Sequence, residues 1–280
     1  MWKRVKCKLC GHDRCMIYID RHKPPIGFCF RNWKAFKLPD TRGEIIMPPP
    51  PGVEKILAKI EAIRTGKTRK KRKTIEWMSD YQLVDSGIEL NYLKNRGIGE
   101  AIIRQYFIGT TRRYPGRVII PEGSIHELYF YSARSVLPNN LLGGQPKYLF
   151  PKGTPKGIFN IDRAHQYKTL IICEGPFSAI AIGVNAIGLY GKTLSKYQRR
   201  LLLDLVPNKE IIVCLDGDAP QHSIKLAQTL AKEYAYVRVC LLPPGYDPAD
   251  MPQSVVHTML SHAKPFSKRT VVGWRLEGRI

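Results

Sequence analysis

The sequence of 280 residues is short of acidic side chains. It holds 23 Asp and Glu against 45 Lys and Arg, which gives a formal net charge of +22. A surplus of this size favours a polyanionic partner, because each phosphate that a cationic side chain neutralises releases bound counterions. Nucleic acid is therefore the leading candidate partner, and a merely soluble or ribosome-associated basic protein is the alternative.

The chain also lacks long apolar runs. No segment approaches the roughly 18 consecutive apolar residues that cross a bilayer, and no apolar core follows the basic first residues as it would in a signal peptide. We therefore expect no membrane contact and a reducing, cytoplasmic location. The seven Cys are then expected to be metal ligands or buried thiols. Three of them lie in apolar stretches and are expected to be inert core thiols: Cys173, Cys214 and Cys240.

A nucleotide-binding P-loop is absent as well. Gly-Lys-Thr begins at Gly66 and again at Gly191, but neither site has the upstream Gly at the spacing that a P-loop requires. We therefore interpret both segments as ordinary loops, and we expect no nucleotide-hydrolysing helicase domain in this sequence.

The order of elements divides the chain. Residues 1–36 alternate as strand, turn and strand, whereas residues 37–78 hold a run of four prolines and a basic run and are expected to be a linker with one short helix. Helices and strands follow over 79–166, and strands alternate with helices over 167–263. The basic residues 264–280 are weakly patterned and are expected to form a loose tail.

Acidic residues follow three of the alternating strands. Glu174 follows the first, Asp216 and Asp218 follow the second, and Asp247 and Asp250 follow the third. Strands that alternate with helices predict a parallel sheet, and the carboxyl ends of its strands meet at one edge. Carboxylates gathered there favour a hard cation, Mg²⁺ or Mn²⁺. The alternative is that each acid only caps the helix that follows it.

These acidic motifs resemble those of one enzyme family. CEGPFSAIAI resembles the glutamate motif of Toprim domains, LDGD resembles their Asp-x-Asp motif, and LPPGYDPADM resembles the third acidic stretch of primases. Upstream, YLKNRGIGEAIIRQYFIG resembles the opening of the polymerase domain of DnaG-type primases. GRVIIP, YSAR, QPKYLF and PKGIFNID follow the order of that domain's basic subdomain. The resemblance spans about residues 81–252, and the ordered set is more specific than any single motif.

The resemblance implies an α/β fold: a Toprim-type parallel sheet, a basic α+β subdomain in front of it, and a small N-terminal zinc ribbon. It implies a DNA primase that synthesises short RNA primers on single-stranded DNA from ribonucleoside triphosphates, by two-metal-assisted nucleotidyl transfer in DNA replication. The compact size suggests a phage or mobile-element primase that acts in the host cytoplasm, with the replicative helicase as a separate chain.

The family's site residues carry over position by position. Glu174, Asp216 and Asp218 match the metal-binding and catalytic acids, and Asp247 matches the first acid of the third motif. The positions that match template or nucleotide contacts, with Lys147 also counted as catalytic, are Arg96, Arg134, Lys147, Tyr148 and Lys156.

The sequence departs from the family pattern after Asp218, where Ala219 and Pro220 stand, and at two acidic positions. Ser178 stands where the family has an Asp, and Ala249 stands where it has the second acid of the third motif, with Asp250 one step late. One metal site is therefore expected to be weaker or filled differently. The departures keep two alternatives open: a catalytically degenerate factor that binds single-stranded DNA or recruits a helicase, and another Toprim nuclease.

The N-terminal cysteines suggest a zinc site. Cys7-Lys-Leu-Cys10 has the form of a zinc knuckle, and Cys29 lies in the second expected strand. DnaG-type primases carry a zinc ribbon at this place, although the residue expected to pair with Cys29 is Asn32 here. The candidates for the fourth ligand, in order of preference, are Cys15, His12 and His22. The alternative is a redox or buried pair of cysteines.

Overall fold

The computed structural model describes residues 72–280, apart from 125, 139–141 and 219, and before residue 72 the backbone of four strands. The chain divides into two compact units, Met1–Lys70 and Lys71–Ile280. In the first unit four strands pair antiparallel in chain order. They are β1 (Trp2–Val5), β2 (Cys15–Asp20), β3 (Lys23–Cys29) and β4 (Lys34–Lys37). Cys7, Cys10, His12 and His22 lie outside the described residues, so zinc binding stays a prediction.

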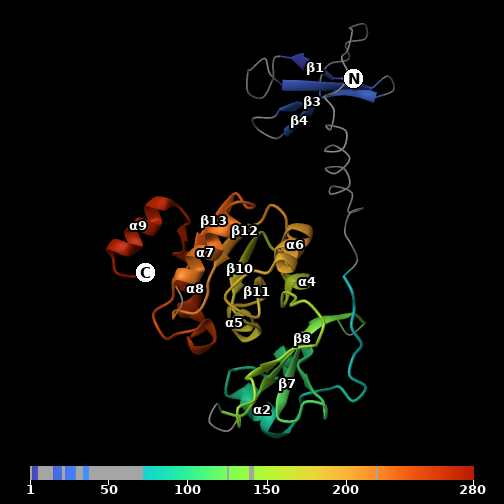
Figure 1. The fold of residues 1–280 in the computed structure, drawn as a ribbon, viewed down its shortest axis with the longest axis vertical. Coiled ribbons are helices and arrows are strands. Elements are labelled where there is room, and N and C mark those ends of the chain that lie inside the picture. Colours follow the sequence, from blue (N-terminus) through green and yellow to red (C-terminus); the bar gives the residue numbers. More distant parts are fainter. Residues whose placement is uncertain are drawn as a thin grey trace. The chain divides into compact units, whose positions relative to one another are not determined.

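The second unit contains two five-stranded sheets (Figure 1). The first, in the order β5-β6-β7-β8-β9, is antiparallel. Its strands and the neighbouring helices are β5 (Gln82–Leu83), α2 (Gly87–Lys94), α3 (Glu100–Tyr106), β6 (Gly109–Thr110), β7 (Arg117–Gly123), β8 (Leu128–Ser135) and β9 (Tyr148–Leu149).

The second sheet has the order β11-β10-β12-β13-β14, in which the first four strands are parallel and β14 is antiparallel. Its elements are α4 (Ile161–Ala164), β10 (Thr169–Cys173), α5 (Pro176–Ile182), β11 (Ala186–Gly188), α6 (Lys196–Leu205), β12 (Glu210–Val213), α7 (Pro220–Leu230), β13 (Tyr236–Val239), the 3₁₀ turn η2 (Pro248–Asp250), α8 (Gln253–Ser261), β14 (Lys264–Pro265) and α9 (Lys268–Leu276). The predicted parallel sheet is confirmed.

The strands of the parallel sheet are apolar on both faces because helices cover both. Alternate residues of one strand enter different cores: Ile171 packs with α5, α8 and the antiparallel sheet, whereas Leu170 and Ile172 pack with α4, α6, α7 and α9. The first core also contains Val118 and Ile120 of β7. The antiparallel sheet therefore packs on the α5 face of the parallel sheet.

Both ends of the second unit differ from the sequence prediction. Within the stretch expected to be linker, Ile75 N donates to Leu128 O at 2.7 Å and Met78 is buried against the outer face of the antiparallel sheet. At the other end, residues 264–280 form β14 and α9, and Trp274 is buried in the second core. The sequence signal was weak at both places because basic residues surround a few anchoring apolar side chains.

The three apolar-strand cysteines are free and buried, as predicted. They stand at or just beyond the carboxyl ends of β10, β12 and β13, and burial raises the pKa of Cys173 well above its ordinary value. In the described residues no helix is long and apolar enough to cross a membrane.

Candidate active site

The candidate active site lies at the carboxyl edge of the parallel sheet. Glu174 directly follows β10, Asp216 follows β12 by three residues, and Asp247 follows β13 in a longer loop. Since β10, β12 and β13 are neighbours in the sheet, the acids of three separate segments meet at one edge. Gly217 lets the loops approach, because a Cβ there would stand 1.9 Å from the carbonyl oxygen of Pro243.

A cavity of about 280 Å³ opens between this edge and the antiparallel sheet. Three of the five predicted acids line it, together with four of the five predicted template- or nucleotide-binding residues. These lining residues are Glu174, Asp216, Asp247, Arg96, Arg134, Lys147 and Tyr148. Asp218, Asp250 and Lys156 stand outside the lining. Ser178, the serine at a position where the family has an acid, is buried and also lines the cavity.

The acids repel one another in this setting. Burial, followed by the charges of Glu174, Asp247 and Asp218, raises the pKa of Asp216 to about 7. Glu174 Oε1 accepts a hydrogen bond from the Asp216 backbone nitrogen at 3.3 Å, and burial raises the Glu174 pKa as well. Asp247 accepts from the Ala249 nitrogen at 2.6 Å and so caps η2. The cap interpretation thus holds for Asp247, although this acid also lines the cavity.

A lysine that sequence reasoning set aside also reaches the acids. Lys192, in the second Gly-Lys-Thr segment, has its Nζ 3.0 Å from Asp218 Oδ1 and 3.8 Å from Glu174 Oε1. Burial alone would lower its pKa, but the hydrogen bond to Asp218 and the surrounding negative charge raise it. Its position after the edge strand β11 was the available signal, because that strand ends at the same edge of the sheet as the acids.

Aromatic rings hold the two arginines on the opposite wall. Arg134 donates through Nε to the Tyr92 hydroxyl at 3.1 Å, and its guanidinium lies 4.7 Å from the Tyr148 ring centre. Arg96 lies 5.1 Å from the rings of both Tyr92 and Phe177. Such contacts fix a guanidinium plane without neutralising its charge, so both arginines remain available to an anion.

The two predicted lysines have different surroundings, one in the cavity lining and the other outside it. Lys147 is an exposed residue, yet partial burial and then the charges of Arg134 and Arg96 lower its pKa. Lys156 instead donates to the Tyr190 carbonyl at 3.0 Å, with its ammonium 4.9 Å from the Phe150 ring centre. Lys147 is therefore the lysine more open to a ligand, whereas Lys156 holds the turn at Tyr190 through its hydrogen bond.

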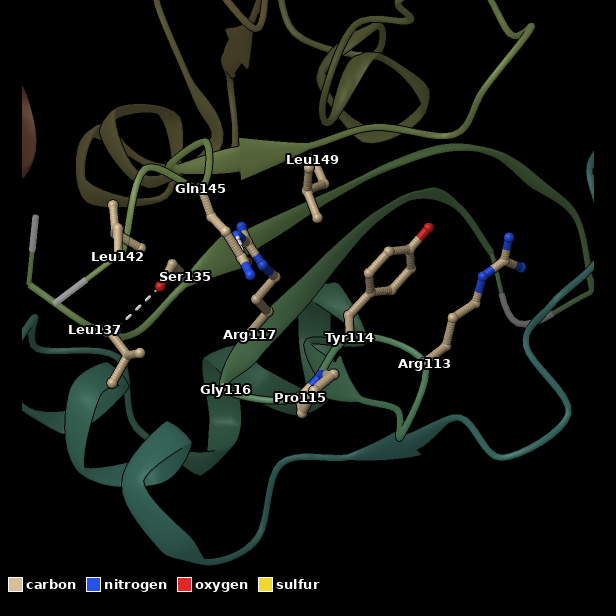
Figure 2. Close-up of a pocket in the computed structure, with 10 residues that line it drawn as sticks. All are labelled: Arg113, Tyr114, Pro115, Gly116, Arg117, Ser135, Leu137, Leu142, Gln145 and Leu149. Carbon is tan, nitrogen blue, oxygen red and sulfur yellow. Dashed lines mark hydrogen bonds between the residues drawn. The ribbon is translucent and has the colours of Figure 1, made fainter.

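A second cavity, of about 330 Å³, lies beside Arg117 of β7 (Figure 2). The buried Arg117 guanidinium donates to the carbonyl oxygens of Ala133, Pro146 and Lys147 at 3.2, 2.8 and 3.3 Å. It also lies 3.4 Å from the side-chain oxygen of Gln145. Arg117 thus fastens the loop that carries Lys147, and sequence reasoning did not single it out.

The donor chemistry of the acidic edge fits a divalent cation. All five acids offer hard oxygen ligands, and Asp216 Oδ1 is buried with no hydrogen-bond partner among the described residues. In that same part of the chain, no three His, Cys, Asp or Glu side chains stand in the arrangement of a formed metal site. The acids therefore offer the ligand types that Mg²⁺ or Mn²⁺ prefers. In this structure the ammonium group of Lys192 lies beside two of them, Asp218 and Glu174.

No protein-family model and no curated protein sequence matches the chain. Among solved structures it is similar to the RNA polymerase domain of the Mycobacterium tuberculosis primase DnaG, with a TM-score of 0.52 and 19% identity over 63% of this chain and 76% of that one. The chain has a primase-like fold. A structure of the Aquifex aeolicus primase, with its zinc-binding and RNA polymerase domains, gives a TM-score of 0.47 and 19% identity over 68% of this chain and 52% of that one.

The observed fold agrees with the predicted α/β class, in which a parallel sheet accompanies an α+β subdomain, here the one with the antiparallel sheet. At 19% identity the likeness shows the fold alone. The roles of single residues are therefore argued from the geometry of this chain.

Proposed function

We propose that the chain is a DNA primase, which joins ribonucleoside triphosphates into short RNA primers on single-stranded DNA by two-metal-assisted nucleotidyl transfer. One observation carries the proposal: carboxylates at the carboxyl edge of a primase-like sheet face cationic side chains across one cavity. Carboxylates alone would repel a triphosphate, and cations alone would bind it without chemistry. Together they suit a reaction in which a 3′ hydroxyl forms a bond to the α-phosphate of the next nucleotide while the bond to the leaving pyrophosphate breaks.

Each wall of the cavity has a task in this reaction. Mg²⁺ or Mn²⁺ held by Glu174, Asp216 and Asp218 would lower the pKa of the attacking 3′ hydroxyl and offset the charge that develops on the α-phosphate. Lys147, whose ammonium is exposed, would bind the triphosphate. Arg134, already oriented by aromatic rings, would hold phosphate oxygens in fixed geometry and so reduce the entropy lost on binding.

The remaining parts of the chain receive roles by extension of the same proposal. Residues 1–36 would bind Zn²⁺ and help to choose the template start sequence, because phosphate contacts carry no sequence information. Residues 37–70, the part of the expected linker that precedes the second unit, would tether this ribbon to the core. A replicative helicase would be a separate chain, and the net charge of +22 would assist binding to the template strand.

The test is template-dependent incorporation of ribonucleotides on a library of single-stranded DNA templates. Wild type should make primers, whereas Asp216→Ala and Asp218→Ala should not. Both variants should bind DNA at least as well as wild type, because the loss of a carboxylate reduces the repulsion of phosphate. Asp85→Ala, which removes an exposed acid outside the cavity lining, is the matched control and should keep full activity.

The same assay separates the alternatives. Tight DNA binding by wild type without any incorporation would identify a degenerate primase-like binding factor. Shortening of the template would identify a nuclease. Primer yields near wild type in both Asp216→Ala and Asp218→Ala would show that these acids are not needed for the reaction.

A further inference from the structure

Lys192 places an ammonium group inside the acidic cluster. Its Nζ contacts Asp218 at 3.0 Å and approaches Glu174 to 3.8 Å, so it joins carboxylates from two different strand ends. Only 34% of the Lys192 side chain is exposed. The Asp218 side chain is 64% exposed, whereas that of Glu174 is only 14% exposed, so the approach to Glu174 is the one that salt screens less.

The turn that carries Lys192 is held in an uncommon conformation. Tyr190 and Gly191 both have positive φ angles, 57° and 152°. Gly191 N donates to the Glu174 carbonyl at 2.9 Å, and the Tyr190 carbonyl accepts from Lys156 at 3.0 Å. A non-glycine residue keeps a positive φ only where its surroundings hold it there. The residue before Lys192 is thus hydrogen-bonded to Glu174, whose carboxylate the lysine approaches.

We propose that Lys192 is a built-in cation of the candidate active site: it orients Glu174 and Asp218 in the metal-free protein and competes with the divalent ion for them. The inference rests on the proposed function, because it assumes that these acids take up a metal ion. A tethered ammonium offsets the repulsion among the acids but supplies no oxygen ligands and no coordination shell. Lys192 is therefore a positioning residue that tunes how tightly the metal binds.

Direct metal binding by the full-length, zinc-loaded protein tests the proposal. Free Mn²⁺ is titrated and followed by electron paramagnetic resonance, and Asp216→Asn defines the part of the signal that belongs to the acidic cluster. Lys192→Met keeps the length of the side chain and removes its charge. It should lower the Mn²⁺ dissociation constant by about fivefold or more, which is what the interaction of two unit charges about 4 Å apart is worth even in water.

Two controls accompany the variant. Lys192→Arg keeps the charge and should bind Mn²⁺ like wild type. Lys196→Met removes an exposed charge on α6 and should also bind like wild type. In addition, metal-free Lys192→Met should melt at a lower temperature than wild type at neutral pH and regain the difference when Mn²⁺ is added.

The outcomes separate this inference from the proposed function. If Asp216→Asn loses Mn²⁺ but Lys192→Met gains no affinity, the role of Lys192 is overturned and the proposed function stands. If Asp216→Asn binds Mn²⁺ like wild type, the acids are not the cation site and both fail. An equal gain in Lys196→Met would show a general effect of net charge and would also overturn the role of Lys192.

Discussion

Glu122 of β7 is a carboxyl group enclosed by the protein. Its side chain is 1% exposed and accepts from Arg72 at 2.9 Å through Oε1, while Oε2 has no partner among the described residues. Gly157 leaves the room for it, because a Cβ there would stand 1.9 Å from Oε2. Burial raises the pKa of Glu122 to about 8 despite the opposing charge of Arg72.

The raised pKa predicts how stability depends on pH. The folded carboxyl binds its proton more tightly than the unfolded one, whose pKa is about 4.3. Its contribution to stability is thus present below that value and is lost as the pH rises through about 8. Glu122→Gln should remove this loss of stability. The difference between the urea midpoints of Glu122→Gln and wild type should therefore increase in favour of the variant from pH 5 to pH 9.

Glu76→Gln, at an exposed position of the same region, supplies the control for the Glu122 experiment and should leave the pH profile unchanged. Identical profiles for wild type and Glu122→Gln would mean that Glu122 is charged when folded, with Arg72 outweighing the cost of its burial.

Among the larger elements, the loops after β12 and β13 touch at Gly217. Its nitrogen donates to the Tyr246 carbonyl at 2.8 Å, and a Cβ would stand 1.9 Å from Pro243 O. Gly217→Ala should therefore push apart the loops that carry Asp216 and Asp247. We expect a loss of about 1–3 kcal/mol in unfolding free energy, as overpacking costs elsewhere, together with weak primer synthesis.

Calorimetry and the incorporation assay check this expectation for Gly217→Ala. Gly273→Ala in α9 is the matched control, because a Cβ there meets nothing within 4 Å and alanine favours a helix. Wild-type activity in Gly217→Ala would mean that the spacing of the two loops does not matter for the reaction.

The loop before β9 depends on Arg117 in a similar way. Arg117→Met would remove the guanidinium donor from the carbonyls of Ala133, Pro146 and Lys147, of which Lys147 keeps its bond from Ser135 N. The cost is about 1–3 kcal/mol for a group that stays buried and unpaired. Because Lys147 is the last residue of this loop before β9, we expect KM for the nucleotide to rise. Steady-state kinetics measure the change, and Arg113→Met, at an exposed position in the same cavity wall, should leave KM near the wild-type value.

On the scale of the whole molecule, the contacts of residues 72–78 determine how stable a truncated fragment of the second unit is. Arg72 bonds to Glu122 and, at 2.5 Å, to Asp162, and Met78 is buried. A fragment of residues 71–280 should therefore melt at a higher temperature than one of residues 79–280. A scan of both fragments by circular dichroism measures the difference, and equal melting temperatures would show that residues 72–78 add no stability.

The longer fragment also tests the division of labour between the units. It keeps the acidic edge and the basic wall, so it should extend primers at low efficiency but without preference for a template start sequence. Sequencing of the products reveals the start sites. A preference equal to that of the full-length chain would place the reading of bases in the cavity itself.

The fold was predictable from sequence where apolar strands alternate with helices, as around Glu174 and Asp216, because a parallel sheet buries both of its faces. The meeting of these acids with Arg134 and Lys147 followed from the family resemblance rather than from periodicity. Lys192 and Arg117 were missed because their importance depends on contacts with residues far away in the sequence. The docking of Arg72 escaped prediction since the residue lies in a basic run typical of a linker.

The hydrophobic core that joins the two sheets has a consequence for both walls of the cavity. One continuous core includes Val118 of the antiparallel sheet, Ile171 of the parallel sheet and Leu260 of α8. The same buried side chains therefore support the acidic edge on one side and the cationic wall on the other. Because a protein interior is close-packed, a loss of volume in this core is felt by both walls at once.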